Sequence, residues 1–441
     1  MPGASGVRAP SRLLIPRPLM TTAPRALDTP LPGRCAAPRA SRRFIAFYGL
    51  ATFGFWMAVM TPVIVTMALK VNQLAPDSKE TTLAWVLGIG AFVAMIANPV
   101  AGLFSDRTRS RFGMRRPWLV GGALLGLAGL IIVAVSPSVW LLMLGWSLAQ
   151  LAYNAVLAAL MALMPDQIHE SQRGAVGGLL GMCMPAGILA GVYMAQAASS
   201  LAQMFLLPAG LFTVFVFLLC ANMRDRLAPA QAAQALSLSG FIRSFMINPR
   251  GASDFLWAFA SRFLLLLGIA TLMTYQVFYM LDKLSISTEA VPDKMFLSTL
   301  VSCVAIVLSS LASGWLSDRC GRRKAFVLIA ALIYAAGLLV IGMADDFRGL
   351  LWGVGVCGLG QGMYVAVDLA LVTEVLPNPD EAAKDLGLFN LASAMPQSVA
   401  PVIAPLFLAM GGPQNYGSLF TAAAAFAGLG ALAVLPIRKV R

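Results

Sequence analysis

Long apolar runs separated by short polar loops dominate the sequence from residue 44 onward. A helix that spans a membrane needs about 20 mostly apolar residues, and twelve runs reach that length. Proline and glycine interrupt many of the runs, which membrane-embedded helices tolerate. The pattern therefore predicts an all-α integral membrane protein with twelve transmembrane helices, at residues 44–68, 83–104, 117–136, 138–164, 174–200, 204–223, 251–281, 294–316, 325–344, 348–376, 384–411 and 416–436.

Two polar segments outside these runs divide the chain into predicted regions. Residues 1–43 contain eight Arg and eight Pro, and this much proline opposes a continuous helix. We expect a disordered basic cytoplasmic leader there, with Met20 as an alternative start of the protein. Residues 224–250 are the second polar segment and are predicted to be a cytoplasmic linker. The linker separates two six-helix halves at residues 44–223 and 251–436, and a cytoplasmic tail follows at 437–441.

The distribution of charge predicts the orientation in the membrane. The chain is 59% hydrophobic and 12% charged, whereas a soluble domain is nearer half apolar and a quarter charged. Of the Lys and Arg residues, 26 lie on the side of the N-terminus and 5 in the opposite loops. Because Lys and Arg favour cytoplasmic loops, both termini are expected in the cytoplasm and the protein in the inner (plasma) membrane. These loops explain the net charge of +13, so the expected partner is a lipid bilayer and not nucleic acid.

The two predicted halves share short sequence motifs at a constant spacing. The sequence GLFSDR at residues 102–107 returns as GWLSDR at residues 314–319, and Pro165 returns as Pro377, each 212 residues later. Each match falls at the same place within its half. A parallel repeat of six spans is an architecture of major facilitator carriers.

The repeated motif also carries a resemblance to a known family. The pattern G-x-x-S-D-R followed by G-R-R resembles the signature of the major facilitator superfamily, and this chain has it twice. The longer first copy, NPVAGLFSDRTRSRFGMRRPW, looks like the glycoside–pentoside–hexuronide:cation symporters and the related sucrose carriers. That group is also similar in PDQIHESQRG at residues 165–174, AVDLALVTEVLP at 366–377 and AKDLGLFNLASAMPQ at 383–397. The resemblance covers nearly the whole chain after residue 43 and implies the major facilitator fold.

The signature implies a gate on the cytoplasmic side. An acid at a helix end, with arginines on a tight glycine-containing turn, can form charge-assisted pairs with neighbouring helix ends. Such pairs close the cytoplasmic side and break when the two halves rock against each other. The alternative is that these charges only fix the orientation in the membrane. The predicted gate residues are Asp106, Arg107, Gly113, Arg115, Arg116, Asp318, Arg319, Gly321, Arg322, Arg323 and Glu374.

Two ionisable residues lie deep in predicted helices, Arg262 in the seventh and Asp368 in the tenth. Charges at membrane depth cost about 2.5–3.5 kcal/mol on insertion scales, which makes such residues candidates for function. A carboxyl group in a low-dielectric cavity can load and release a proton, so Asp368 with Arg262 as its partner is the predicted proton-coupling pair. The alternative is a static buried pair that holds two helices together.

One departure from the resembled group concerns the coupling ion. Sodium-coupled members carry an acid just before the proline of the second helix, and this chain has Asn98 there. An amide has no charge with which to hold Na⁺. The resemblance therefore favours H⁺ as the coupling ion, with Na⁺ the less favoured one.

Polar and aromatic residues of the first, fourth, seventh and tenth helices are candidates for solute binding, because these helices line the central cavity of the superfamily. Amides and phenols suit a hydroxyl-rich ligand, and aromatic rings suit the C–H face of a sugar. Helix packing or an interfacial aromatic belt explains any single one equally well, so only the set is informative. The candidates are Tyr48, Trp56, Asn98, Gln150, Tyr153, Asn154, Gln276, Tyr279, Gln361 and Tyr364, with Thr52 and Tyr275 beside them.

The sequence offers little material for enzyme chemistry. It has one histidine, six cysteines without a CxxC pair, and no GxxxxGK[ST] loop. We expect no enzymatic activity, no cofactor and no metal. The prediction is a monomeric secondary active transporter that works by alternating access and takes up a small-molecule solute, a sugar or glycoside, together with protons. The alternatives are a proton-driven exporter of an amphipathic small molecule and a transport-inactive membrane scaffold or receptor.

Overall fold

Helices form the framework of the protein, as the apolar pattern predicts. The computed structural model describes residues 39–225, 253–320, 322–375, 382–410, 412 and 414–437, without the side chains of residues 318, 369–375 and 382–390. Within these residues, twelve helices are long and apolar enough to cross a membrane, which confirms the predicted number. The predicted leader before residue 39, most of the linker and most of the tail lie outside the described residues.

The first span of the N-terminal half is interrupted by a wider helical turn. α1 (Arg42–Thr61) continues through a π-helical turn (Pro62–Thr66) into α2 (Met67–Leu74). Pro62 begins this turn, and its carbonyl accepts a hydrogen bond from the amide of Met67, five residues later. After a 3-10 turn (Pro76–Ser78), the half continues with α3 (Lys79–Arg107), α4 (Arg116–Val135), α5 (Val139–Gln167), α6 (Glu170–Ala197) and α7 (Leu201–Asn222).

The C-terminal half repeats the arrangement of six spans. Short polar side chains begin several helices of both halves, because their oxygens accept the first free backbone amides. Ser138, Ser200 and Asn415 each accept from the amide three residues further on. The helices of this half are α9 (Ser253–Asp282), α10 (Val291–Cys320), α11 (Arg323–Met343), α12 (Phe347–Val375), α13 (Ala382–Leu408) and α14 (Tyr416–Ala433).

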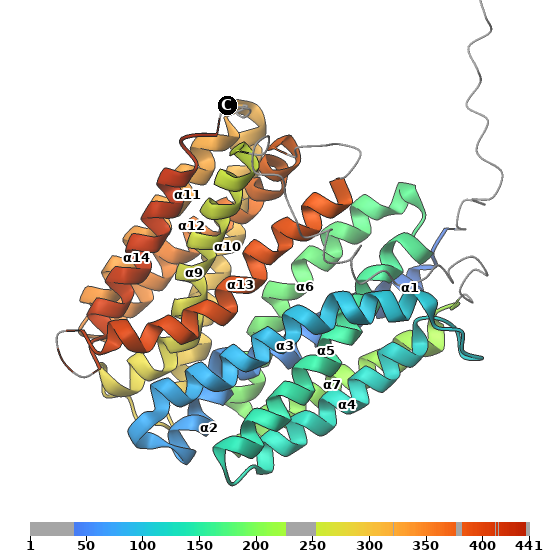
Figure 1. The fold of residues 1–441 in the computed structure, drawn as a ribbon, viewed down its shortest axis with the longest axis horizontal. Coiled ribbons are helices and arrows are strands. Elements are labelled where there is room, and N and C mark those ends of the chain that lie inside the picture. Colours follow the sequence, from blue (N-terminus) through green and yellow to red (C-terminus); the bar gives the residue numbers. More distant parts are fainter. Residues whose placement is uncertain are drawn as a thin grey trace, which may run out of the picture. The chain divides into compact units, whose positions relative to one another are not determined.

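The helices pack into two six-helix groups within residues 38–441 (Figure 1). In the N-terminal half, α5 packs on α3 and α4, and α1 on α6 and α7; in the C-terminal half, α12 packs on α10 and α11, and α14 on α9 and α11. Between the halves, α3 lies along α13 and α6 along α10. Gly88 allows the first of these contacts, because a Cβ atom there would already lie 3.4 Å from Val402.

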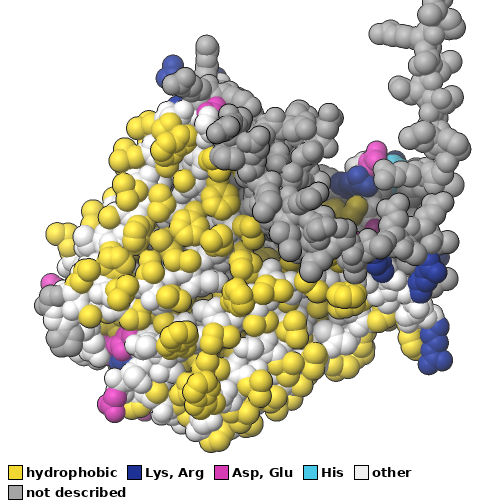
Figure 2. Space-filling view, viewed as in Figure 1, with side chains coloured by type: hydrophobic (Ala, Val, Ile, Leu, Met, Phe, Trp, Pro, Cys, Tyr) yellow, Lys and Arg dark blue, Asp and Glu magenta, His cyan; other side chains and the backbone are white. Residues whose placement is uncertain are grey.

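Apolar side chains cover much of the face shown in Figure 2, and charged side chains lie near its edges. Large exposed side chains such as Trp140 and Trp352 suit contact with lipid. Two lysines correct the predicted loop assignment, because Lys70 and Lys79 are buried in α2 and α3 and do not lie in an outer loop. Lys70 donates to the carbonyl of Ala134 (3.0 Å), near the C-terminal end of α4, where a helix favours a cation.

Candidate functional site

A cavity lies between the two halves. Its walls come from α1, the π-helical turn, α3, α5 and α6 on one side and from α9, α12 and α13 on the other. It encloses about 130 Å³, less than the roughly 300–1,000 Å³ of pockets for drug-sized ligands. The polar groups in its wall are Gln150, Thr274, Gln361, Ser393 and Gln397.

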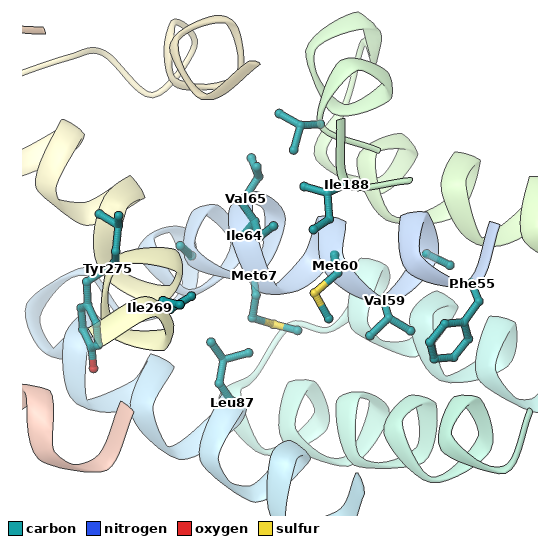
Figure 3. Close-up of a cluster of buried hydrophobic side chains, with 14 of the residues drawn as sticks. Phe55, Val59, Met60, Ile64, Val65, Met67, Leu87, Ile188, Ile269 and Tyr275 are labelled. Carbon is teal, nitrogen blue, oxygen red and sulfur yellow. The ribbon is translucent and has the colours of Figure 1, made fainter. Parts of the chain in front are cut away.

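The remaining wall of the cavity is apolar. Figure 3 shows Met60 of α1, Leu87 of α3 and Ile269 of α9, and all three side chains belong to this wall. Trp146 of α5 adds a fully buried aromatic ring. A pocket of this kind binds by contact with apolar surface, and its few polar groups orient the ligand.

A charged pair adjoins the cavity. Arg262 of α9 donates to the carboxylate of Asp368 of α12, which confirms that the two predicted intramembrane charges meet. Asp368 also accepts from the hydroxyl of Tyr364 (2.6 Å), one turn earlier on α12. The Nε of Arg262 donates to the Oγ of Ser393 of α13 (2.7 Å). The contact fits both a proton-coupling pair and a static pair, so the coupling role stays a prediction.

Two of the predicted solute-binding residues, Gln150 and Gln361, line the cavity. Others are used in helix packing instead. The hydroxyl of Tyr48 donates to the carbonyl of Leu160 (2.7 Å) and joins α1 to α5. The hydroxyl of Tyr279 lies within hydrogen-bond distance of the carbonyl of Ala344 (2.7 Å), at the end of α11. These two tyrosines are buried away from the cavity, which corrects their predicted role.

The remaining candidates also lie outside the cavity wall. Tyr153 is fully buried and packs edge-on against Phe212. The amide of Gln276 donates to Ser298 of α10, so it holds two helices of one half together. Four further residues satisfy local contacts or lie half-buried in their helices: Thr52 donates to Tyr48, Asn154 donates to Gln150, Trp56 packs beside Phe55, and Asn98 precedes Pro99 in α3.

Sequence reasoning missed three cavity residues, Thr274, Ser393 and Gln397. Single hydroxyls and amides occur in many membrane helices, and nothing in the sequence separates a cavity-lining one from a packing one. The signal that could have found two of them is helical spacing. Ser393 and Gln397 are four residues apart and therefore share one face of α13.

The first copy of the signature forms a cluster around a buried arginine. Arg115 pairs with Asp106 at the end of α3 (2.6 Å) and with Asp166 near the end of α5 (3.0 Å). It also donates to Ser105 (2.8 Å). The predicted pairs with neighbouring helix ends are thus confirmed for Arg115, and all of them lie within the N-terminal half. Their proposed role in closing the cytoplasmic side stays a prediction.

Asp225, just after α7, was not predicted and holds the start of α4. Its carboxylate accepts from the backbone amides of Arg115 (2.7 Å) and Arg116 (2.8 Å). An anion is favourable at this helix end because the first amides have no partner within the helix. Gly113 has a φ of +106°, and a Cβ atom there would overlap the carboxylate of Asp225. Glycine is therefore required at position 113 for two separate reasons.

Other predicted gate residues are described only in part. Arg107 donates to the carbonyl of Leu103 (3.3 Å), within its own helix. Arg319 stacks on the ring of Trp315. Arg322 precedes the first residue of α11, Arg323. The side chains of Asp318 and Glu374, and residue Gly321, lie outside the described residues.

A second charged contact joins the two halves at the opposite end of the helices. Lys79, the first residue of α3, pairs with Asp282, the last residue of α9. Their side chains are only 8% and 11% exposed. The hydroxyl of Tyr416, at the start of α14, also donates to Asp282. This contact lies at the predicted outer end, whereas the Arg115 cluster lies at the predicted cytoplasmic end.

Comparison with known proteins supports this picture. The sequence pattern of the Major Facilitator Superfamily matches residues 44–292 and 259–441. The chain is 22% identical to the MFS transporter asaE of Aspergillus flavus, over 79% of this chain and 76% of that protein. It is 24% identical to the General alpha-glucoside permease of Schizosaccharomyces pombe, over 30% of this chain and 25% of the permease. It is 26% identical to the Sucrose transport protein SUT1 of Oryza sativa subsp. japonica, over 19% and 14%.

Solved structures of low sequence identity share the fold. The nucleoside transporter NupG superposes with a TM-score of 0.71 at 14% identity, over 90% of this chain and 100% of that one. A bacterial homolog of the human lysosomal transporter Spinster gives 0.67 at 10% identity, over 91% and 98%. Because the family pattern runs from residue 44 to the end and two six-helix halves each carry its signature, the chain belongs to the Major Facilitator Superfamily.

Proposed function

We propose that the protein is a secondary active transporter that takes up a sugar or glycoside together with protons, by alternating access of a central site. The observation that carries this proposal is the Arg262–Asp368 pair, which reaches the cavity wall through Ser393. A carboxylate beside a solute pathway can exchange its charge for a proton without leaving the membrane interior. Proton binding and solute binding then act on one connected group of side chains.

The chemistry of the cavity supports a hydroxyl-rich solute. Its polar groups are neutral hydroxyls and amides, among them Gln150, Gln361 and Gln397, which can both donate and accept hydrogen bonds. The small volume favours a compact solute over a large amphipathic one. The names of two relatives, an alpha-glucoside permease and a sucrose transport protein, point to the same class of solute.

The charge balance of the pair supports coupling to protons. While Asp368 is ionised, it compensates the charge of Arg262. When Asp368 binds a proton, the guanidinium loses this counter-charge and depends on neutral partners such as Ser393 and a bound solute. A solute that contacts this group therefore favours the protonated carrier, and by linkage the proton favours solute binding. Asn98, which cannot hold Na⁺ by charge, agrees with this choice of ion.

Alternating access requires that each end of the cavity can close. We assign closure of the predicted cytoplasmic end to the signature residues around Asp106 and Arg115, with both termini on that side of the inner (plasma) membrane. The Lys79–Asp282 pair joins the halves at the other end. In this assignment the two ends open in turn around the fixed cavity.

Transport into proteoliposomes tests the proposal. Radiolabelled glucose, maltose and sucrose would be offered separately, under an inward proton gradient, an inward sodium gradient or neither. We expect accumulation of at least one sugar that follows the proton gradient. Accumulation that ignores the proton gradient and follows the sodium gradient would contradict proton coupling, and accumulation of none would contradict the sugar assignment.

The variant Asp368→Asn isolates the coupling step. It imitates the protonated carboxyl group, so it should still exchange labelled for unlabelled sugar and should fail to concentrate sugar against a gradient. The matched control is Asp345→Asn, which alters a carboxylate that is 91% exposed. Because removal of one partner of a buried pair costs about 3–5 kcal/mol, folding is checked first by the melting temperature. A folded Asp368→Asn protein that concentrates sugar like the parent would show that the proton site lies elsewhere.

A further inference from the structure

α13 contains three prolines, Pro396, Pro401 and Pro405, among its cavity-side and outer turns. Proline has no amide hydrogen, so each one leaves the carbonyl four residues earlier without its usual helical donor. In α13 these carbonyls belong to Ala392, Gln397 and Pro401. A membrane interior supplies no water to replace such a donor, so each carbonyl needs a partner from the protein or from a water-filled space.

One of these carbonyls shows how the requirement is met. The carbonyl of Pro401, freed by Pro405, accepts a hydrogen bond from the hydroxyl of Tyr275 of α9 (3.1 Å). A buried tyrosine from a neighbouring helix thus takes the place of the missing backbone donor. The freed carbonyls of α13 are therefore acceptors that bind donors from outside the helix.

The carbonyl of Gln397, freed by Pro401, lies at the cavity. The side chain of Gln397 belongs to the cavity wall, as does that of Ser393, one turn earlier on the same face. A helical carbonyl and its missing donor at i+4 lie on nearly the same face, so this acceptor shares the face of the two side chains. Across the cavity, Gln150, Thr274 and Gln361 supply further neutral polar groups.

We propose that Ser393, Gln397 and the backbone carbonyl of Gln397 form a subsite that binds the hydroxyl groups of a polyhydroxylated solute. The inference rests on the proposed sugar transport and assigns binding to α13, which carried no predicted solute-binding residue. The carbonyl only accepts, whereas the serine hydroxyl and the amide both donate and accept. Neighbouring hydroxyls of a polyol can supply the donor that the carbonyl lacks and accept from the serine or the amide. Because Ser393 also contacts Arg262, a solute at this subsite touches the charged pair through one side chain.

The variant Pro401→Ala tests the backbone acceptor. It returns an amide hydrogen to position 401, so the carbonyl of Gln397 regains a helical partner while every cavity-lining side chain stays the same. The matched control is Pro405→Ala, which offers the same new donor to the carbonyl of Pro401, already bound by Tyr275. Both changes place a better helix former in a helix, so both variants should fold.

Binding of radiolabelled glucose, maltose and sucrose to the purified full-length protein is the measurement. For the sugar bound best by the parent, we expect Pro401→Ala to weaken affinity roughly 3- to 10-fold, the loss of about one hydrogen bond, and Pro405→Ala to change it less than 2-fold. Ser393→Ala should weaken binding similarly to Pro401→Ala. Ser313→Ala, which removes a hydroxyl bonded within α10, should leave affinity unchanged.

The outcomes separate the subsite from the wider proposal. Unchanged affinity in Pro401→Ala, or an equal loss in Pro401→Ala and Pro405→Ala, would overturn the subsite while a sugar-binding parent keeps the proposed function. A parent that binds none of the three sugars would overturn both the subsite and the sugar assignment. A parent that binds a sugar with affinity lost in Pro401→Ala and kept in Pro405→Ala would support the subsite.

Discussion

At the predicted outer end, Lys79 of one half pairs with Asp282 of the other, whereas at the predicted cytoplasmic end Arg115 pairs with Asp106 and Asp166 of its own half. Both clusters hold a buried cation between helix ends. Only the first resists separation of the halves, because only its partners lie on opposite sides of the cavity. Thus, in this conformation, the signature motif holds one half together internally, and an unremarked lysine outside the signature links the two halves.

The two copies of the signature differ in a second way. After the first copy, the anion Asp225 beyond α7 accepts amides at the start of α4. After the second copy, Lys324 in the first turn of α11 donates to the carbonyls of Leu435 (2.6 Å) and Ile437 (2.7 Å), beyond α14. Each contact joins the third helix of a half to the end of its sixth. The repeat has therefore kept the contact between the elements and reversed the sign of the charge that makes it.

The largest effect is expected from Lys79→Ala, which breaks the link between the halves. The change leaves Asp282 buried without its cation, and loss of one partner of a buried pair costs about 3–5 kcal/mol. The measurement is the melting temperature of the purified protein, with Lys283→Ala as the matched control. Lys283 pairs with Asp345 at the same end, within one half and at an exposed carboxylate, so its loss should cost about 0–1 kcal/mol.

The charge reversal Lys79→Asp with Asp282→Lys sharpens this test. If the pair links the halves, the double variant should recover part of the stability that either single change removes. Equal losses in Lys79→Ala and Lys283→Ala, or no recovery in the double variant, would show that the inter-half pair has no special weight.

The next effect concerns the turn of the first signature copy. Gly113→Ala places a side chain at a φ of +106° and against the carboxylate of Asp225, which should cost about 1–3 kcal/mol. Gly121→Ala in α4 is the control, because a Cβ atom there meets nothing within 4 Å. Alanine is favoured over glycine inside a helix by about 0.5–1 kcal/mol, so the control should be neutral or more stable. Equal melting temperatures for the two variants would contradict the steric argument.

A smaller effect is expected from the anion that holds α4. Asp225→Ala removes the acceptor of two backbone amides, and loss of such a cap costs about 0.5–2 kcal/mol. Asp225→Asn keeps an acceptor oxygen and loses the charge, so its melting temperature should lie between those of the parent and Asp225→Ala. A larger loss for Asn than for Ala would show that Asp225 acts through another contact.

The smallest effect is expected from the corresponding cation of the other half. Lys324→Met keeps the length of the side chain and removes its charge near the end of α14, where a cation is worth about 0.3–1 kcal/mol. The difference in melting temperature from the parent should shrink as salt is raised, because exposed charges are screened. A loss as large as that of Lys79→Ala would remove the contrast between contacts within and between halves.

The sequence by itself determined the twelve spans, the two halves and the meeting of the two intramembrane charges. The reason is the cost of polar groups in lipid: it forces runs of about 20 apolar residues and leaves few charges at depth, so Arg262 and Asp368 had few other partners. The repeated signature likewise fixed where the Arg115 cluster forms, because its acids and arginines occupy the ends of neighbouring helices.

The tertiary structure alone decided which polar side chains face the cavity. Tyr48 and Tyr279 looked as suitable for a sugar as Gln150 and Gln361, yet the rotation of their helices turns their hydroxyls to carbonyls of neighbouring helices. Apolar periodicity is weak in these spans because lipid and core are both apolar, so the sequence does not record how each helix is rotated. The partners of Lys79, Asp225 and Ser393 lie 203, at least 109 and 131 residues away along the chain, and only the packing of the helices brings them together.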